Sequence, residues 1–224
     1  MTEQKTAYNT GRLYRILAVV IVLACFGLGV WAYPHLPDRV PSHWNAAGQV
    51  NGYTSQAGGA FLLPGILAAV LILMYVIPRI DPKRSNFRLM GKVYWLLVFV
   101  VSLFLSLVYT GTILYALGLV HSRFVPVSAQ AGIGILFIVL GNYMPKIKYN
   151  YMFGIRTPWT LASEEVWYKT HRALGPFWMV SGVVLLFAGF LPNPWTAYFT
   201  LSLVLILALG SVLYSYILFR QRKQ

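Results

Sequence analysis

Long apolar runs alternate with shorter polar segments along this chain. Six of the runs come close to the roughly 20 residues that a helix needs to cross about 30 Å of hydrocarbon. They cover residues 14–33, 60–78, 93–117, 127–145, 174–191 and 196–219. The pattern predicts an all-α polytopic membrane protein with six transmembrane helices. The first run follows Lys5, Arg12 and Arg15 and exceeds the apolar core of a signal peptide, so we expect a retained helix.

Composition and charge placement support this interpretation and predict an orientation. Hydrophobic residues make up 58% of the 224 positions and charged residues 10%, against about 25% charged in soluble domains. The formal net charge is +13, yet all but two of the 18 lysines and arginines lie in the terminal tails or in loops 79–92 and 146–172. The positive-inside rule therefore predicts cytoplasmic N- and C-termini. The basicity indicates contact with membrane lipids rather than direct nucleic acid binding.

The polar segments divide the chain into three predicted parts. Residues 1–80 form an N-terminal two-span unit with an extracytoplasmic loop at 34–59, and residues 81–126 form a connecting loop and the third span. Residues 127–224 form a three-span unit with a cytoplasmic loop at 146–173. The spans carry almost no ionisable side chains, which disfavours ion-coupled transport. A small-molecule or lipid transporter that uses a gap between spans remains an alternative.

The outer loop "LPDRVPSHWNAAGQVNGYTSQ" is rich in proline and contains the turn-forming pair Asn51-Gly52. These residues restrict the backbone, so we expect a compact, ordered loop rather than a flexible tether. Its polar and aromatic side chains offer hydrogen-bonding groups and stacking surfaces for a ligand. The candidate ligand-binding residues are His43, Trp44, Asn45 and Tyr53.

Three histidines on the same predicted side, His35, His43 and His121, are candidate metal ligands. They lack HExxH or any other tight ligand spacing, so we expect neither a metal nor another cofactor. No catalytic nucleophile or base is recognisable either, and we expect a protein that is not an enzyme. An outward-facing metal-dependent enzyme that uses these histidines is the remaining catalytic alternative.

The inner segment "GIRTPWTLASEEVWYKTHR" (154–172) predicts a helix that begins after Ser163, an N-cap residue followed by two glutamates. Lys169 lies four residues after Glu165 and is expected to pair with it. Apolar residues such as Val166 and Trp167 lie on another face. We therefore expect an amphipathic helix in the lipid headgroup layer, either as a connector that anchors the bundle or as a docking surface for a cytoplasmic partner.

Two stretches of this inner region, "GNYMPKIKYNYM" (141–152) and "GIRTPWTLASEEVWYKTHRALG" (154–175), closely resemble the signature of the SdpI family of bacterial membrane immunity proteins. Upstream, "LPDRVPSHWNAAGQVNGY" (36–53) is similar to a domain of unknown function that commonly precedes that signature.

The resemblance implies a non-enzymatic, multi-pass protein of the bacterial cell membrane that confers resistance to a secreted, membrane-active peptide toxin. It also implies a receptor role, in which a cytoplasmic winged-helix autorepressor is held at the membrane. The outer loop would then meet the peptide, and the inner loop would present the docking surface. The candidate inner residues, for docking or as a structural motif, are Asn142, Arg156, Trp159, Thr160, Glu165, Trp167 and His171.

Overall fold

The computed structural model describes residues 2–222, with the side chains of residues 11–222, so the side chains of Lys5 and Lys223 lie outside the described residues. Six helices in this part of the chain are long and apolar enough to cross a membrane. They are α1 (Thr2–Ala32), α2 (Gln56–Ile80), α4 (Gly91–Ala116), α5 (Phe124–Tyr143), α7 (Glu164–Ala188) and α8 (Trp195–Gln221). The predicted polytopic α-helical membrane fold is confirmed.

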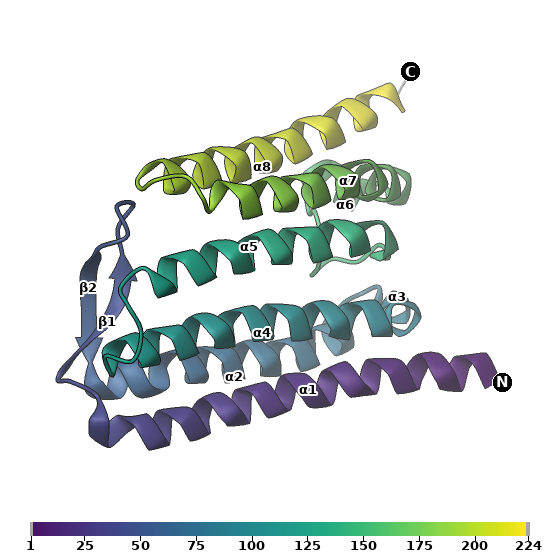
Figure 1. Ribbon diagram of the computed structural model, residues 1–224. Helices are drawn as coiled ribbons and strands as arrows, with labels where there is room; N and C mark the ends of the chain where they lie inside the picture. Colours follow the sequence, from purple (N-terminus) through teal and green to yellow (C-terminus); the bar gives the residue numbers. More distant parts are fainter. Residues whose placement is uncertain (1, 223–224) are drawn as a thin grey trace.

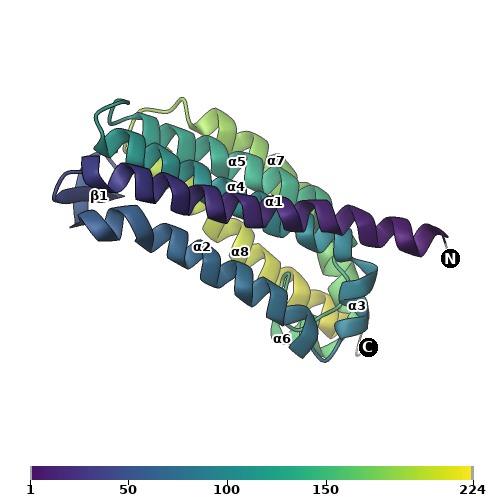
Figure 2. The same cartoon turned by 90° about the horizontal axis from the view of Figure 1, so that it is seen from below.

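The long helices run side by side, and short elements cover the two ends of the bundle (Figure 1). Helix α1 packs on α4 and α2, α5 packs on α7 and α4, and α8 packs mainly on α7. The short elements are η1 (Tyr33–His35), β1 (Arg39–Trp44), β2 (Val50–Ser55), α3 (Arg84–Leu89), η2 (Met144–Lys146) and α6 (Pro158–Ala162). Figure 2 shows α3 and α6 at the same end as both chain termini, with β1 at the opposite end.

The outer loop contains a β-hairpin that the all-α prediction did not include. Strands β1 and β2 pair antiparallel, with Arg39 opposite Ser55 and Trp44 opposite Val50, and the register shifts near His43. Ser55 then caps α2, because its hydroxyl accepts a hydrogen bond from the backbone N–H of Gly58 at 3.1 Å. The loop is thus compact and ordered, as its proline and turn residues predict.

Helix α7 differs from the prediction in its length. Ser163 is its N-cap, with the side chain accepting from the N–H of Val166, so the predicted start is confirmed. The helix then continues without interruption from Glu164 to Ala188 and includes Pro176. Residues 164–173 are therefore not separate from the predicted fifth span, because one continuous helix contains both.

Glycines allow α5 and α7 to approach each other closely. A Cβ atom added to Gly182 would lie 2.5 Å from the carbonyl oxygen of Gly134, and one added to Gly141 would lie 2.5 Å from the backbone nitrogen of Met179. Small residues at such positions let helix backbones touch in a membrane, where packing replaces the hydrophobic effect as the main attraction between helices.

We expect Gly182→Ala to destabilise the bundle by about 1–3 kcal/mol, because the added methyl group forces α5 and α7 apart. The measurement is the thermal unfolding midpoint of the purified protein in detergent. Gly65→Ala is the matched control, since a Cβ there would meet nothing within 4 Å. Equal midpoints for the two variants would contradict the close α5–α7 contact.

Candidate functional site

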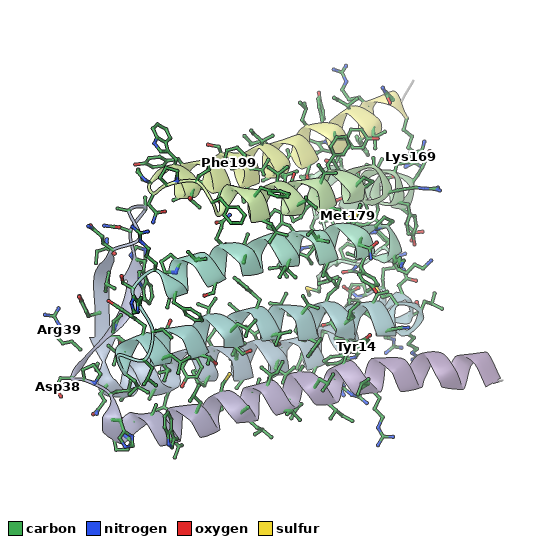
Figure 3. The ribbon with its side chains drawn as sticks, viewed as in Figure 1. Tyr14, Asp38, Arg39, Lys169, Met179 and Phe199 are labelled. Atoms are coloured by element: carbon green, nitrogen blue, oxygen red, sulfur yellow. The ribbon has the colours of Figure 1, made fainter. Side chains whose placement is uncertain are left out.

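Polar and aromatic side chains gather at the two ends of the bundle. We call the end with both termini, α3, α6 and the loop between α5 and α6 the motif end, and the end with β1 and β2 the hairpin end. Figure 3 shows Asp38 and Arg39 at the hairpin end and Lys169 at the motif end. The predicted outer and inner residues therefore lie at opposite ends of the molecule.

Trp167 is the centre of the motif end. Its side chain is fully buried, and the indole Nε1 donates to the carbonyl oxygen of Ile147 at 3.0 Å. The indole stacks on the His171 ring with centroids 4.2 Å apart, and the Tyr149 ring packs edge-on against it at 5.5 Å. Helix α7 thus holds the preceding loop through one large side chain.

His171 fixes the turn that enters the signature. Its Nε2 accepts a hydrogen bond from the backbone N–H of Ile155 at 3.0 Å, so Nδ1 carries the proton and donates to the carbonyl oxygen of Trp167 at 2.8 Å. Gly154 adopts a φ of 113°, and a Cβ atom there would lie 2.7 Å from His171 Nε2. Only glycine fits this position without strain.

Asn150 and Tyr149 organise the same loop from within, and neither was among the sequence candidates. The Asn150 side chain is fully buried, donates to the carbonyl oxygens of Lys148 and Phe153, and accepts from two backbone N–H groups of the loop. Burial, together with the neighbouring Tyr151 hydroxyl, raises the pKa of Tyr149 to about 12. The neutral phenol donates to the carbonyl oxygen of Leu161 at 2.6 Å.

Asp81 ties this loop to the N-terminal half of the chain. Its carboxylate is buried and accepts hydrogen bonds from the backbone N–H groups of Lys83 at 2.7 Å and Tyr151 at 2.9 Å. Asn86 of α3 donates to the carbonyl oxygen of Tyr149 at 2.7 Å. The sequence offered no signal for this connection, because a single aspartate after a helix is compatible with any polar loop.

The predicted inner residues divide into buried and exposed sets. Thr160 is fully buried and forms a capping box with Thr157 at the start of α6. Trp167 and His171 are buried as well, so these three side chains build the motif end from inside. Exposed or half-buried are Asn142, Arg156, Trp159 and Glu165.

The exposed set lies along the rim of the motif end. Arg156 donates to the carbonyl oxygen of Tyr151 at 3.1 Å, and the Trp159 ring packs on Tyr216 of α8 at 5.0 Å. Glu165 pairs with Lys169 at 2.7 Å, which confirms the predicted ion pair, and also with Arg222 at 3.5 Å. These side chains offer a cation, an aromatic ring and an anion to an approaching partner.

At the hairpin end, His43 and Asn45 stabilise the hairpin itself. His43 Nδ1 lies 2.6 Å from the Asn51 side-chain oxygen across the two strands. The Asn45 side-chain oxygen accepts from the backbone N–H of Gln49 at 3.0 Å and closes the turn. Asn193, in the loop between α7 and α8, donates to the carbonyl oxygen of Ala47 at 3.3 Å and fastens the hairpin tip to the other half of the bundle.

Tyr53 and Trp44 lie in contrasting environments on the hairpin. Tyr53 is 50% exposed, with the Arg39 guanidinium 4.8 Å from its ring centre. Trp44 packs near Tyr115 of α4 at 6.1 Å. Its indole N–H is buried and has no hydrogen-bond partner among the described residues. This donor lies beside the hairpin turn, since Trp44 is the last residue of β1, and it is one of the few buried polar groups left unpaired among the described residues.

The histidines that a metal site would need are not brought together. His35 Nδ1 lies 3.1 Å from the carbonyl oxygen of Trp31, His43 contacts Asn51, and His121 belongs to the loop between α4 and α5. Within residues 11–222, no three side chains of the His, Cys, Asp or Glu type are placed to hold a metal ion.

Comparison with known proteins supports the resemblance noted in the sequence. Residues 146–215 match the SdpI/YfhL protein family, and residues 20–68 match a domain of unknown function, DUF1648. The chain is 25% identical over 201 residues to "Immunity protein SdpI" of Bacillus subtilis (strain 168), which covers 90% of this chain and 93% of that protein. The predicted resemblance to the SdpI family is confirmed. No solved structure matches the chain.

Proposed function

We propose that this multi-pass membrane protein, which carries an SdpI/YfhL region behind a DUF1648 region, is a non-enzymatic immunity protein that protects its cell from a membrane-active peptide. The observation that carries the proposal is the alignment with an immunity protein along almost the whole of both chains. The alignment is long enough to include both polar ends of the bundle as well as the spans between them.

The proposed orientation places the hairpin end outside and the motif end in the cytoplasm. Arg39 and Arg123 are the cations expected on the outer side, whereas the loops and tails of the other end hold the remaining lysines and arginines. Such an asymmetry favours the basic end on the cytoplasmic side. A peptide that arrives from outside would then meet the hairpin first.

Protection of this kind needs binding and no chemical step. A peptide already dissolved in the bilayer is captured by helix packing and a few polar contacts. The exposed Tyr53 ring and the unpaired indole N–H of Trp44 are the groups that we assign to peptide contact. His43 and Asn45 act by holding the hairpin in shape.

The test is expression in a susceptible Gram-positive cell that is then exposed to the matching killing peptide. Protection by the wild-type chain, and its loss in a Trp44→Phe/Tyr53→Ala variant that still reaches the membrane at the same level, would support the proposal. Killing that is unchanged by the wild-type chain would refute it.

For the motif end we propose a receptor role, in which a cytoplasmic winged-helix autorepressor docks on the exposed rim. Arg156, Trp159 and Glu165 provide one cation, one aromatic ring and one anion, and arginine and tryptophan are the side chains that most often dominate protein interfaces. The buried Trp167 and His171 would keep this rim in a fixed geometry.

We expect Arg156→Ala and Trp159→Ala each to weaken recruitment of the repressor about tenfold or more, because each removes an interface anchor of at least about 1.4 kcal/mol. Co-sedimentation of the repressor with membranes measures the effect. Lys146→Ala is the matched control, since Lys146 is exposed near the same loop and its ammonium group lies 4.6 Å from the centre of the Tyr143 ring. Recruitment that survives both changes would place the docking surface elsewhere.

A further inference from the structure

A second polar feature of the motif end lies outside the signature, where α1, α2, α3 and α4 meet. A pocket of about 370 Å³ opens between these elements, within the size range of small-ligand sites in proteins. Five arginines from three of the elements line it: Arg12, Arg15, Arg79, Arg84 and Arg88.

The arginines of this pocket have no carboxylate partner among the side chains of residues 11–222. No lining residue is an aspartate or glutamate, and none of the five pairs with a carboxylate among the described side chains. Asp81 lies close in sequence, but its oxygens already accept from the N–H groups of Lys83 and Tyr151. Guanidinium groups gathered around one pocket repel one another, so an anion bound among them would relieve this repulsion.

Part of the pocket lining is aromatic. Tyr94 is buried there, and the Trp95 ring lies 4.7 Å from the Tyr75 ring and 5.8 Å from the Arg15 guanidinium. Gly11 keeps α1 against α4, because a Cβ atom there would lie 3.2 Å from the carbonyl oxygen of Gly91. The pocket thus combines aromatic rings with planar, permanently charged donors, and such donors match phosphate oxygens in a bidentate manner.

We propose that this pocket binds an anion that carries two phosphate groups. Five guanidinium groups offer more charge than one singly charged phosphate needs, which favours a doubly phosphorylated ligand. The anion could be supplied by a lipid headgroup, as in the basic pockets that bind cardiolipin between transmembrane helices, or by a free diphosphate. The site is separate from the rim of Arg156 and Trp159 and from the hairpin, and it does not depend on the proposed immunity function.

The experiment uses the full chain purified in detergent, titrated separately with cardiolipin, with inorganic pyrophosphate and with phosphatidylcholine. The readouts are the thermal unfolding midpoint and the adducts retained in native mass spectrometry. We expect a rise in the midpoint with cardiolipin or pyrophosphate and none with phosphatidylcholine. An Arg84→Gln/Arg88→Gln variant should need roughly thirtyfold more of that ligand for half-saturation. This factor corresponds to the binding free energy that two cations near an anionic headgroup typically contribute.

The matched control is Lys146→Gln/Lys148→Gln, which removes the same charge from exposed lysines outside the pocket. The ligand concentration that half-saturates this control should stay within about threefold of the wild-type value, because distant exposed charges are screened by salt. If the first variant does not fold, Arg12→Gln/Arg15→Gln tests the same pocket from α1. Response to cardiolipin alone assigns the site to a lipid, and response to pyrophosphate assigns it to a soluble anion. Response to neither, or equal weakening in the pocket and control variants, would overturn the proposal.

Discussion

Trp167→Ala should destabilise the protein by about 3–5 kcal/mol, the range found when large buried aromatic side chains are truncated. The indole is fully buried, donates to the carbonyl oxygen of Ile147, and stacks on the His171 ring. Its removal leaves a cavity and an unpaired acceptor, and it takes away the surface on which the loop before α6 rests. The loss of stability should therefore extend from α7 to the whole motif end.

Thermal unfolding of the purified protein in detergent measures this loss. Trp195→Ala is the control, because Trp195 is 65% exposed at the start of α8 and its truncation should have a small effect. A Trp167→Ala protein with the unfolding midpoint of the control would show that the indole does not support the loop.

Asp81→Ala should lower the free energy of unfolding by about 2–4 kcal/mol. It should also break the contact between the two halves of the chain at the motif end. The buried carboxylate accepts hydrogen bonds from the N–H groups of Lys83 and Tyr151. Hydrogen bonds to charged groups contribute about 1.5–3 kcal/mol, and a buried donor that loses its acceptor adds a desolvation cost. The effect should be concentrated in residues 149–153 rather than spread over the bundle.

Amide hydrogen exchange resolves that localisation. In Asp81→Ala, the amide of Tyr151 should exchange much faster than in the wild type, while amides at the α5–α7 contact near Gly182 keep their protection. Asp38→Ala provides the control, since this carboxyl group is exposed at the hairpin end. Unchanged exchange at Tyr151 would mean that Asp81 does not hold the loop.

The sequence predicted the fold well where one local pattern decides the structure. The apolar runs identified all six long helices because only a helix satisfies its own backbone hydrogen bonds across a bilayer. Ser163 predicted the start of α7, and the four-residue spacing of Glu165 and Lys169 predicted their ion pair. In each case the determining residues are neighbours in the chain.

Features that depend on distant residues could not be predicted in this way. The contact of Asp81 with Tyr151 joins residues 70 positions apart, and the arginine pocket draws on four separate elements. The length of α7 was missed because polarity in residues 164–173 resembles that of an interfacial segment. In the fold, Val166, Trp167 and His171 turn inward and the charged side chains turn outward, so one continuous helix accommodates both.

The signature residues fall into a buried set and an exposed set, which indicates two different roles. The buried residues Thr160, Trp167 and His171 form the framework of the motif end, and Arg156, Trp159 and Glu165 are carried on its surface. A receptor requires a ligand at one end to change affinity at the other. Helices α5 and α7, which connect the two ends through glycine contacts, are the elements through which we expect such coupling to pass.

The central claim is that the hairpin end faces the outside and the motif end faces the cytoplasm. It is tested by cysteine labelling in intact cells, starting from a Cys25→Ser chain, since Cys25 is the single native cysteine. Cysteines introduced at Ser42 and at Ser85, both exposed, mark the two ends. We expect a membrane-impermeant maleimide to label position 42 in intact cells and position 85 only after the membrane is opened. The reverse pattern would contradict the account.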